Sequence, residues 1–245
     1  MISERELSHY SNKGELNFRK FLGKTEIKKV KREFSNFVKY KINKMILGKD
    51  YSLSKSKKIP SSLHRLEKFK ESYFYKIAKK KDIINYASVL IGDKAKLHSI
   101  QFFMKYSKDN HATPKHQDNA YWCFKKGKGI SFWIAINKVS KENGGMFYLQ
   151  GSHKKNHIHS SSSIPGSSLI IKNVTKKFKK VYYSLNPGDA VAHDSKTIHG
   201  SFNNKIKKDR IGFILCYVSK KAKQDRSLKK SYEKKLNRIN SKKLV

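Results

Sequence analysis

The sequence predicts a protein of the α+β class that is mainly β, with a helical N-terminal region followed by an antiparallel sandwich or jelly roll. Apolar residues recur every three or four positions over the first ninety residues, whereas short aromatic and β-branched runs begin near residue 95. Strands and helices do not alternate, which argues against a doubly wound parallel sheet. The 245 residues are enough for one sizeable core, and we expect a single domain over 1–245.

The helical region is expected over residues 1–94. Residues 14–46 carry an apolar stripe with lysines outside it, which predicts an amphipathic helix that Gly23 interrupts once. The polar stretch "SKSKKIPSS" at 54–62 is expected to be a loop. A second helical segment is expected to follow it over 62–92, with Ser62 as its N-cap.

The strands are expected over residues 95–220, where Gly, Asn, Pro and Ser turns separate the apolar runs. The runs are "KLHSIQFFMKY", "GISFWIAINKV", "MFYLQGSH", "KVYYSLNPGDAVAHD" and "RIGFILCYVS". Residues 221–245 are Lys-rich and almost wholly polar, which is typical of a solvated helix or a disordered tail.

The composition is strongly basic, with 56 Lys and Arg against 18 Asp and Glu and a net charge of +38. Such a charge favours anionic partners, including nucleic acid. Only seven of the bases are Arg, however, and nucleic-acid sites use Arg heavily for its bidentate fork and its stacking. An AT-rich coding sequence also produces a Lys excess, so codon bias is the leading explanation and an electrostatic role the alternative.

Cysteine usage and the N-terminus both favour a cytoplasmic protein. Cys123 and Cys216 lie inside apolar runs, and two buried free thiols suit a reducing compartment. The first 18 residues contain no apolar segment of the kind that a signal peptide needs. The longest apolar run, 130–136, is too short to span a bilayer.

A His and an Asp stand two residues apart in "TPKHQDNAYW", at His116 and Asp118. On a strand such residues point to the same face, so both side chains can bind one metal ion. The pair alone is weak evidence, because an H-x-D sequence arises often by chance. His199, in "TIHGS", is the best third ligand among the ten histidines. Two His and one carboxylate form the facial triad of non-haem Fe(II) oxygenases.

Arg210 lies eleven residues beyond His199, at the start of a buried apolar run. An arginine at the mouth of a strand can bind a carboxylate through two parallel hydrogen bonds. The alternative is a salt bridge to a nearby acidic residue. Together with the three metal-ligand candidates, Arg210 favours a site that holds an anionic co-substrate.

The order of these motifs resembles the phytanoyl-CoA dioxygenase family over residues 95–220. The H-x-D pair is followed by an aromatic pair, a Trp-containing strand, an "NG" and "GSHK" signature, a "GD" turn, and "HGS" with an Arg beyond it. The matching residues are Tyr121, Trp122, Trp133, Ala135, Asn143, Gly144, Gly151, Ser152, His153, Lys154, Gly188, Asp189, His199 and Arg210. The resemblance implies an Fe(II)- and 2-oxoglutarate-dependent dioxygenase on a double-stranded β-helix, a cupin-like jelly roll with the N-terminal helices packed on it.

The resemblance also implies a role for each site residue. His116, Asp118 and His199 are the implied iron ligands, and Arg210 and Ser201 the implied partners of the far carboxylate of 2-oxoglutarate. Further polar groups for 2-oxoglutarate or substrate are expected from one strand face, at Gln101 and Lys105. The expected walls of the substrate pocket are Tyr121, Trp122, Phe103 and Tyr148.

The expected reaction is hydroxylation of an unactivated C–H bond in a small organic substrate, with O2 as second co-substrate. Halogenating relatives carry a small residue in place of the aspartate, whereas this chain keeps Asp118. The Lys excess favours an anionic substrate. The alternative function is a basic jelly-roll module that binds nucleic acid or anionic surfaces without catalysis.

Other histidines offer weaker sites. His157 and His159 could bind zinc from one extended segment, but Ser and Lys surround them, which favours a mobile surface loop beside the active-site mouth. His111 is expected to line the entrance or to lie in a solvated loop. His193 is expected to be structural or to support the ligands.

Overall fold

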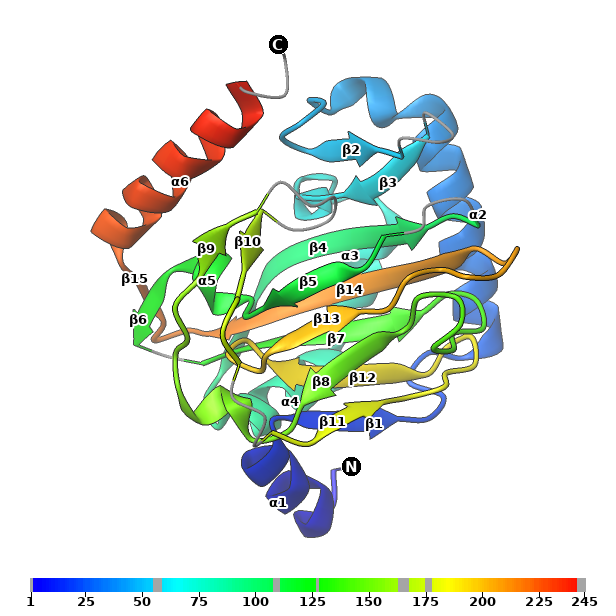
Figure 1. The fold of residues 1–245 in the computed structure, drawn as a ribbon. Coiled ribbons are helices and arrows are strands. Elements are labelled where there is room, and N and C mark those ends of the chain that lie inside the picture. The colour runs from blue at the N-terminus through cyan, green and yellow to red at the C-terminus, as the bar shows by residue number, and fades with distance from the viewer. Residues whose placement is uncertain are drawn as a thin grey trace.

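The computed structural model describes residues 2–54, 59–107, 111–126, 128–162, 168–174 and 178–241. Two antiparallel sheets face each other, and helices cover the outer face of the larger sheet (Figure 1). This arrangement confirms the predicted mainly β class and the antiparallel jelly roll. Cys123 and Cys216 are both buried, free thiols.

The larger sheet has seven strands in the order β1-β12-β7-β14-β4-β3-β2. Its strands are β1 (Glu15–Phe18), β2 (Tyr51–Leu53), β3 (Pro60–Leu63), β4 (Ala95–Lys105), β7 (Gly129–Ala135), β12 (Ala190–Asp194) and β14 (Arg210–Ser219). Side chains alternate between its faces, so Ile100, Phe102 and Met104 of β4 pack beneath the helices. Phe103, between them, faces the interior between the two sheets.

The smaller sheet has four strands in the order β11-β8-β13-β5. They are β5 (Thr113–His116), β8 (Met146–Leu149), β11 (Lys180–Tyr182) and β13 (His199–Ser201). Two short pairs complete the strands: β9 (Ser160–Ser161) with β10 (Leu169–Ile170), and β6 (Phe124–Lys126) with β15 (Lys223–Gln224). An apolar core fills the space between the two sheets, with Trp122, Trp133 and Tyr148 among its members.

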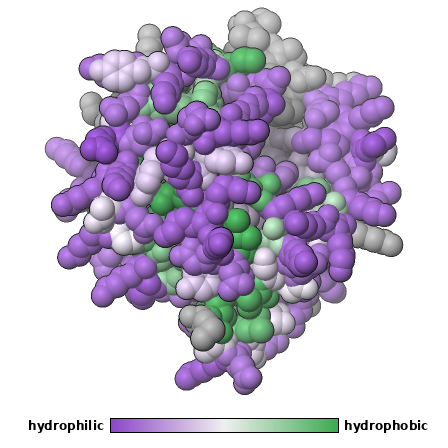
Figure 2. Space-filling model, turned by 180° about the vertical axis from the view of Figure 1, so that it is seen from behind, coloured by the Kyte–Doolittle hydropathy of each residue, from purple (hydrophilic) through white to green (hydrophobic). Residues whose placement is uncertain are grey.

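The helices are α1 (Glu4–Lys13), α2 (Lys24–Tyr40), α3 (Tyr73–Ala78), α4 (Lys81–Ile91), α5 (Asn119–Trp122) and α6 (Arg226–Ser241), with 3-10 turns at Ile42–Lys44, Leu66–Lys68 and Ser152–Lys154. A second apolar core lies between the larger sheet and α2, α3 and α4. From behind, the surface is mostly hydrophilic, with hydrophobic groups visible from the centre to the lower part of the view and at a few places near the top (Figure 2).

Three predictions for the N-terminal region are wrong. The loop expected over 54–62 includes the start of β3 at Pro60, and residues 55–58 of that stretch lie outside the described residues. Residues 14–22 are not helical, because Glu15–Phe18 forms β1 and pairs with β12. Ser62 is not an N-cap but lies in β3, and the helices of the second segment begin only at Ser72, the N-cap of α3. Strands of residues 1–94 therefore form both edges of the larger sheet.

The polar C-terminal segment forms α6 over 226–241, which agrees with the helical alternative for 221–245; residues 242–245 lie outside the described residues. Within the described part of the chain, we find no helix with the length and apolar character that crossing a membrane requires.

Candidate metal centre

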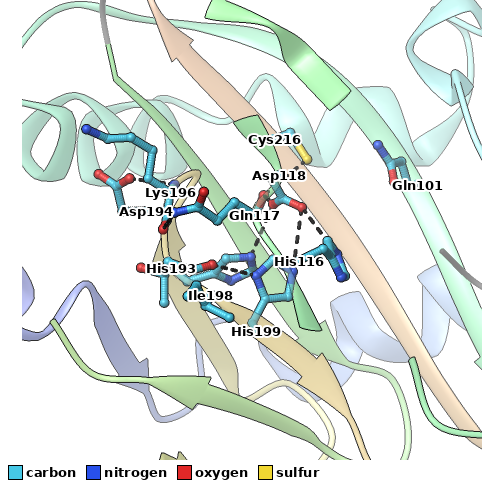
Figure 3. Close-up of polar contacts among 12 residues, drawn as sticks. Gln101, His116, Gln117, Asp118, His193, Asp194, Lys196, Ile198, His199 and Cys216 are labelled. Atoms are coloured by element: carbon cyan, nitrogen blue, oxygen red, sulfur yellow. Dashed lines mark hydrogen bonds and ion pairs between the residues drawn. The ribbon is translucent and has the colours of Figure 1, made fainter. Parts of the chain in front are cut away.

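Three predicted ligands meet between the two sheets. His116 ends β5, and Asp118 follows it at the start of the short helix α5. His199 begins β13 and is the register partner of His116 on the neighbouring strand. One ligand atom from each of the three residues lies within 4.8 Å of the others (Figure 3). Backbone pairing therefore places the side chains around a common point despite 83 residues of separation.

Hydrogen bonds to the backbone fix the tautomer of both histidines. Nδ1 of His116 lies 2.8 Å from the carbonyl oxygen of Pro114, and Nδ1 of His199 lies 2.9 Å from that of Thr197. A carbonyl only accepts, so each Nδ1 carries the hydrogen and donates it. Each Nε2 is left with a lone pair that faces Asp118, as metal binding requires.

Burial keeps the two imidazoles neutral. Desolvation lowers the pKa of His116 and holds the pKa of His199 well below its usual range. Neutral imidazole is the form that binds a metal ion. The protein therefore presents both ligands in their binding form at neutral pH.

Asp118 is an ionised carboxylate with two differently used oxygens. Burial alone would raise its pKa, but His199 and a hydrogen bond from His193 outweigh burial and hold the pKa below its usual range. Its Oδ2 accepts hydrogen bonds from Ser131 Oγ at 2.7 Å and from His193 Nε2 at 3.2 Å. Its Oδ1 faces Nε2 of His199 at 3.5 Å and Nε2 of His116 at 3.9 Å.

These donors fit a first-row metal ion, and Fe(II) in particular. Two neutral imidazole nitrogens and one carboxylate oxygen on one side of a point are the facial ligand set of non-haem iron enzymes. Such a set leaves the opposite side of the ion for other ligands. No further group of three His, Cys, Asp or Glu side chains with this spacing occurs among the described residues.

Arg210 is a fully enclosed cation. Its side chain is 2% exposed, and burial lowers its pKa to about 10, so it stays protonated at pH 7. Nε donates to the carbonyl of Gly144 and Nη1 to that of Phe103, both at 3.2 Å. No acidic side chain of the described residues forms an ion pair with it, which answers the salt-bridge alternative. A buried cation without a counter-ion is costly, and this indicates a site for an anion.

The surroundings of Arg210 are consistent with such a site. The guanidinium lies 5.3 Å from the ring centre of Trp133, which packs directly on Gly212, where a side chain would collide with the indole. The buried hydroxyl of Tyr148 lies close enough to Arg210 to influence its pKa, and it has no hydrogen-bond partner among the described residues. An anionic ligand with several oxygens would satisfy both groups.

The other predicted cofactor residues lie on the interior strands. Ser201 is fully buried on β13, and its Oγ accepts a hydrogen bond from the backbone of Thr113. Lys105 is buried opposite Arg210 on β4, and its Nζ donates to the carbonyls of Phe202 and His111. Gln101 donates to Ser99, farther along β4.

The predicted wall residues fall into two groups. Tyr121 lies edge-on to His116, with ring centres 5.6 Å apart, and Tyr148 is the strand partner of His199 on β8. Both therefore adjoin the ligands. Trp122 instead packs on the ring of His98, and Phe103 on that of His64.

Ser131 and Gln117 are contacts of the site that the sequence interpretation does not include. Ser131 is the one polar residue in the apolar run 130–136, which is the signal that could have pointed to it. Gln117 lies between His116 and Asp118 in the sequence, and its side chain points away from theirs. Its side chain donates to the carbonyls of Lys155 and Lys196 and accepts from the backbone of His157.

The segment around His159 makes hydrogen bonds beside the metal centre, and its expected mobility stays a prediction. The backbone N–H of Gln117 donates to Nε2 of His159, and Nδ1 of His159 donates to the carbonyl of His157. His159 therefore holds its own segment against the metal centre. The predicted loop continues into residues 163–167, which lie outside the described residues.

A comparison with protein families gives a match over residues 10–212 to the family described as phytanoyl-CoA dioxygenase (PhyH). The chain belongs to the phytanoyl-CoA dioxygenase family. Curated relatives include the peroxisomal phytanoyl-CoA dioxygenases of Bos taurus and Homo sapiens, each 23% identical over 219 residues and 84% of this chain. The aligned part spans 65% of the length of these relatives.

Several solved structures of similar fold are described as enzymes that bind or depend on 2-oxoglutarate (alpha ketoglutarate). EctD from S. alaskensis, with 2-oxoglutarate and 5-hydroxyectoine, has a TM-score of 0.74 at 16% identity, covering 91% of this chain and 78% of its own. The epimerase SnoN, with Fe3+ and alpha ketoglutarate, has a TM-score of 0.72 at 18% identity, covering 89% and 84%. The carbocyclase SnoK has a TM-score of 0.73 at 18% identity, covering 91% and 86%. These similarities confirm the predicted jelly-roll fold.

Proposed function

We propose that the protein is an Fe(II)- and 2-oxoglutarate-dependent dioxygenase that hydroxylates an unactivated C–H bond of a small organic substrate. His116, Asp118 and His199 would hold the iron. Arg210 would pair with the far carboxylate of 2-oxoglutarate. Family membership and the ligand set support this assignment.

The observation that carries the proposal is the buried guanidinium of Arg210, which has no acidic partner among the described residues and lies in the same interior as the three ligands. A metal site alone would suit many enzymes. A metal site next to a buried cation fits a co-substrate that binds the metal at one end and carries a carboxylate at the other. 2-Oxoglutarate is such a molecule. Tyr148 and Ser201 would complete the receptor with hydroxyl groups.

The bound iron would supply the activation of O2 that couples oxidation of the substrate to decarboxylation of 2-oxoglutarate. In the balanced reaction one oxygen atom enters succinate, the other enters the product as a hydroxyl group, and CO2 leaves. The protein contributes geometry and an enclosed interior. Arg210 orients the co-substrate, and the backbone bonds to Nδ1 keep both imidazoles in their binding orientation.

Hydroxylation is the proposed outcome because Asp118 is present as the carboxylate ligand. The structures described as an epimerase and a carbocyclase have the same fold, so a second class of outcome is ring formation or inversion at carbon. Both begin with the same co-substrate chemistry. Succinate release therefore tests the common step before the product is known.

The test is anaerobic loading of the purified protein with Fe(II) and 2-oxoglutarate, followed by exposure to O2 and measurement of succinate. We expect slow release without substrate and none from Asp118→Ala or His199→Ala. Asp93→Ala is the matched control, because Asp93 is a carboxylate that bonds to Ser219 on the outside of the sheet. Full succinate release by either ligand variant would contradict the assignment. Salt-dependent binding to nucleic acid without any metal requirement would favour the basic binding module.

A further inference from the structure

Three interior side chains form a row on adjacent strands of the larger sheet, directly beneath Asp118. His193 on β12 is the register partner of Ser131 on β7, and Ser131 is the register partner of Cys216 on β14. All three are at most 2% exposed. We call His193, Ser131 and Cys216 the interior row. Figure 3 shows two of its members beside Asp118.

The interior row binds only one oxygen of the carboxylate. Ser131 Oγ and His193 Nε2 both reach Oδ2 of Asp118, at 2.7 and 3.2 Å. Oδ1 is the oxygen that faces the two ligand imidazoles. Oδ2 of Asp118 is therefore bound to the larger sheet, whereas Oδ1 faces the position where a metal ion would bind.

The ionised carboxylate of Asp118 determines which groups of the interior row donate hydrogen bonds. An ionised carboxylate only accepts, so Ser131 must donate its single hydroxyl proton to Asp118. Its contact with Sγ of Cys216, at 3.5 Å, then requires the thiol to donate. Burial raises the pKa of Cys216 to about 12, which keeps the thiol protonated for this role. His193 likewise donates from Nε2.

We infer that Ser131 and His193 are positioning residues that hold Oδ2 of Asp118 and so keep Oδ1 facing the position where a metal ion would bind. The inference rests on the proposed function, because it concerns the same metal. Partners that hold a ligand from behind commonly change metal affinity by about 10- to 100-fold when removed. A carboxylate freed from its two donors would rotate, and it could bind through both oxygens and occupy a position meant for the co-substrate.

The test measures Fe(II) affinity of the metal-free protein by anaerobic titration, together with its thermal midpoint. Ser131→Ala and His193→Leu each remove one donor and are expected to weaken binding about 10- to 100-fold. His193→Gln keeps an N–H near the position of Nε2 and is expected to restore most of the affinity. Ser72→Ala is the matched control, a buried serine that caps α3. It should lower the thermal midpoint without changing the affinity for Fe(II).

The outcomes separate this inference from the function on which it rests. The inference is overturned if the unaltered protein binds Fe(II) while Ser131→Ala and His193→Leu bind it equally well. It is also overturned if His193→Gln is as weak as His193→Leu, because His193 would then be a ligand itself. Failure of the unaltered protein to bind Fe(II), or undiminished binding by Asp118→Ala, would instead overturn the proposed function, and the inference with it.

Discussion

Arg210 is a buried cation of the site, and its hydrogen bonds within the described part of the chain go to the neutral carbonyls of Gly144 and Phe103. A charge in this position is stable when an anion joins it. Its planar fork can bind a carboxylate at two points, whereas a lysine offers one compact charge.

We therefore expect Arg210→Lys to weaken 2-oxoglutarate binding about 10- to 100-fold, the loss of one charge-assisted hydrogen bond of about 1.5–3 kcal/mol. Affinity for Fe(II) should stay within about twofold, because Arg210 does not contact the ligands. The visible charge-transfer band that forms when 2-oxoglutarate chelates Fe(II) measures the first effect. An unchanged titration curve for 2-oxoglutarate would remove Arg210 from the receptor.

Two histidines outside the metal centre, His64 and His98, are expected to make stability depend on pH. Burial lowers the pKa of His64 to about 4, and burial and Lys229 lower the pKa of His98 to about 4. In the unfolded chain both take up a proton near pH 6.5. Between pH 6.5 and 4 the unfolded state therefore binds more protons, and the free energy of unfolding falls as the pH falls.

Each of the two histidines is expected to contribute a slope of up to about 1.4 kcal/mol per pH unit in this window. His64→Gln with His98→Gln should flatten the pH profile of the unfolding free energy between pH 6.5 and 4. Urea unfolding at intervals of half a pH unit measures the slope. Equal slopes for the unaltered protein and the double variant would show that both side chains charge freely in the folded state.

At the scale of elements, Gln117 connects the metal centre to the segment 155–159. Besides the backbone bond from Ala120 to its carbonyl, it makes four hydrogen bonds, to Lys155, His157, His159 and Lys196. The residue lies between two ligands but points away from them. It therefore ties neighbouring segments to the end of β5 without contacting the metal position.

We expect Gln117→Ala to speed amide hydrogen exchange across 155–161 and to speed cleavage by trypsin after the exposed Lys154 and Lys155. Three side-chain hydrogen bonds are lost, so the unfolding free energy should fall by about 1–3 kcal/mol. Gln224→Ala, which loses one bond to the carbonyl of Trp122, is the control. Unaltered exchange in 155–161 would mean that other contacts hold this segment.

The long interior strands were predictable because their composition differs from that of the helices around them. β1 was not, because four residues, "ELNF", do not distinguish a strand period from the helical spacing that continues through Phe21 and Leu22. β3, "PSSL", has no β-branched or aromatic residue and is a strand because it pairs with β4. Both β1 and β3 are therefore strands because of the neighbouring strands with which they pair, β12 and β4.

The same limit applies to the candidate site. His116 and Asp118 were recognisable because residues two apart share a face, which needs only local geometry. Ser131 and His193 reach Asp118 through strand register, which pairs residues 62 positions apart. Nothing local in the sequence specifies that register.

At the scale of the whole molecule, the metal centre spans both sheets. His116 and His199 belong to the smaller sheet, while Ser131 and His193, which hold Asp118, belong to the larger one. An ion bound to these ligands would add a link between elements that the apolar core and hydrogen bonds such as those from Ser131 and His193 to Asp118 already join.

Metal binding should therefore stabilise the entire fold. At a free Fe(II) concentration of 100 times Kd, the unfolding free energy is expected to rise by about 2.7 kcal/mol. Thermal midpoints measured anaerobically with Fe(II) and with a chelator give the size of the effect. Asp118→Ala should show no difference between the two conditions, and a shift of the same size in that variant would place the stabilising ion elsewhere.

The position of β14 has a consequence for how the chain is made. It lies in the middle of the larger sheet, between β4 and β7, yet it is synthesised after both of them. Until residue 219 emerges, β4 and β7 each have an unpaired edge, and such edges invite association with other chains. Translation that stops before this point should leave an aggregation-prone product, because the fold depends on β14 to join two strands that were synthesised earlier.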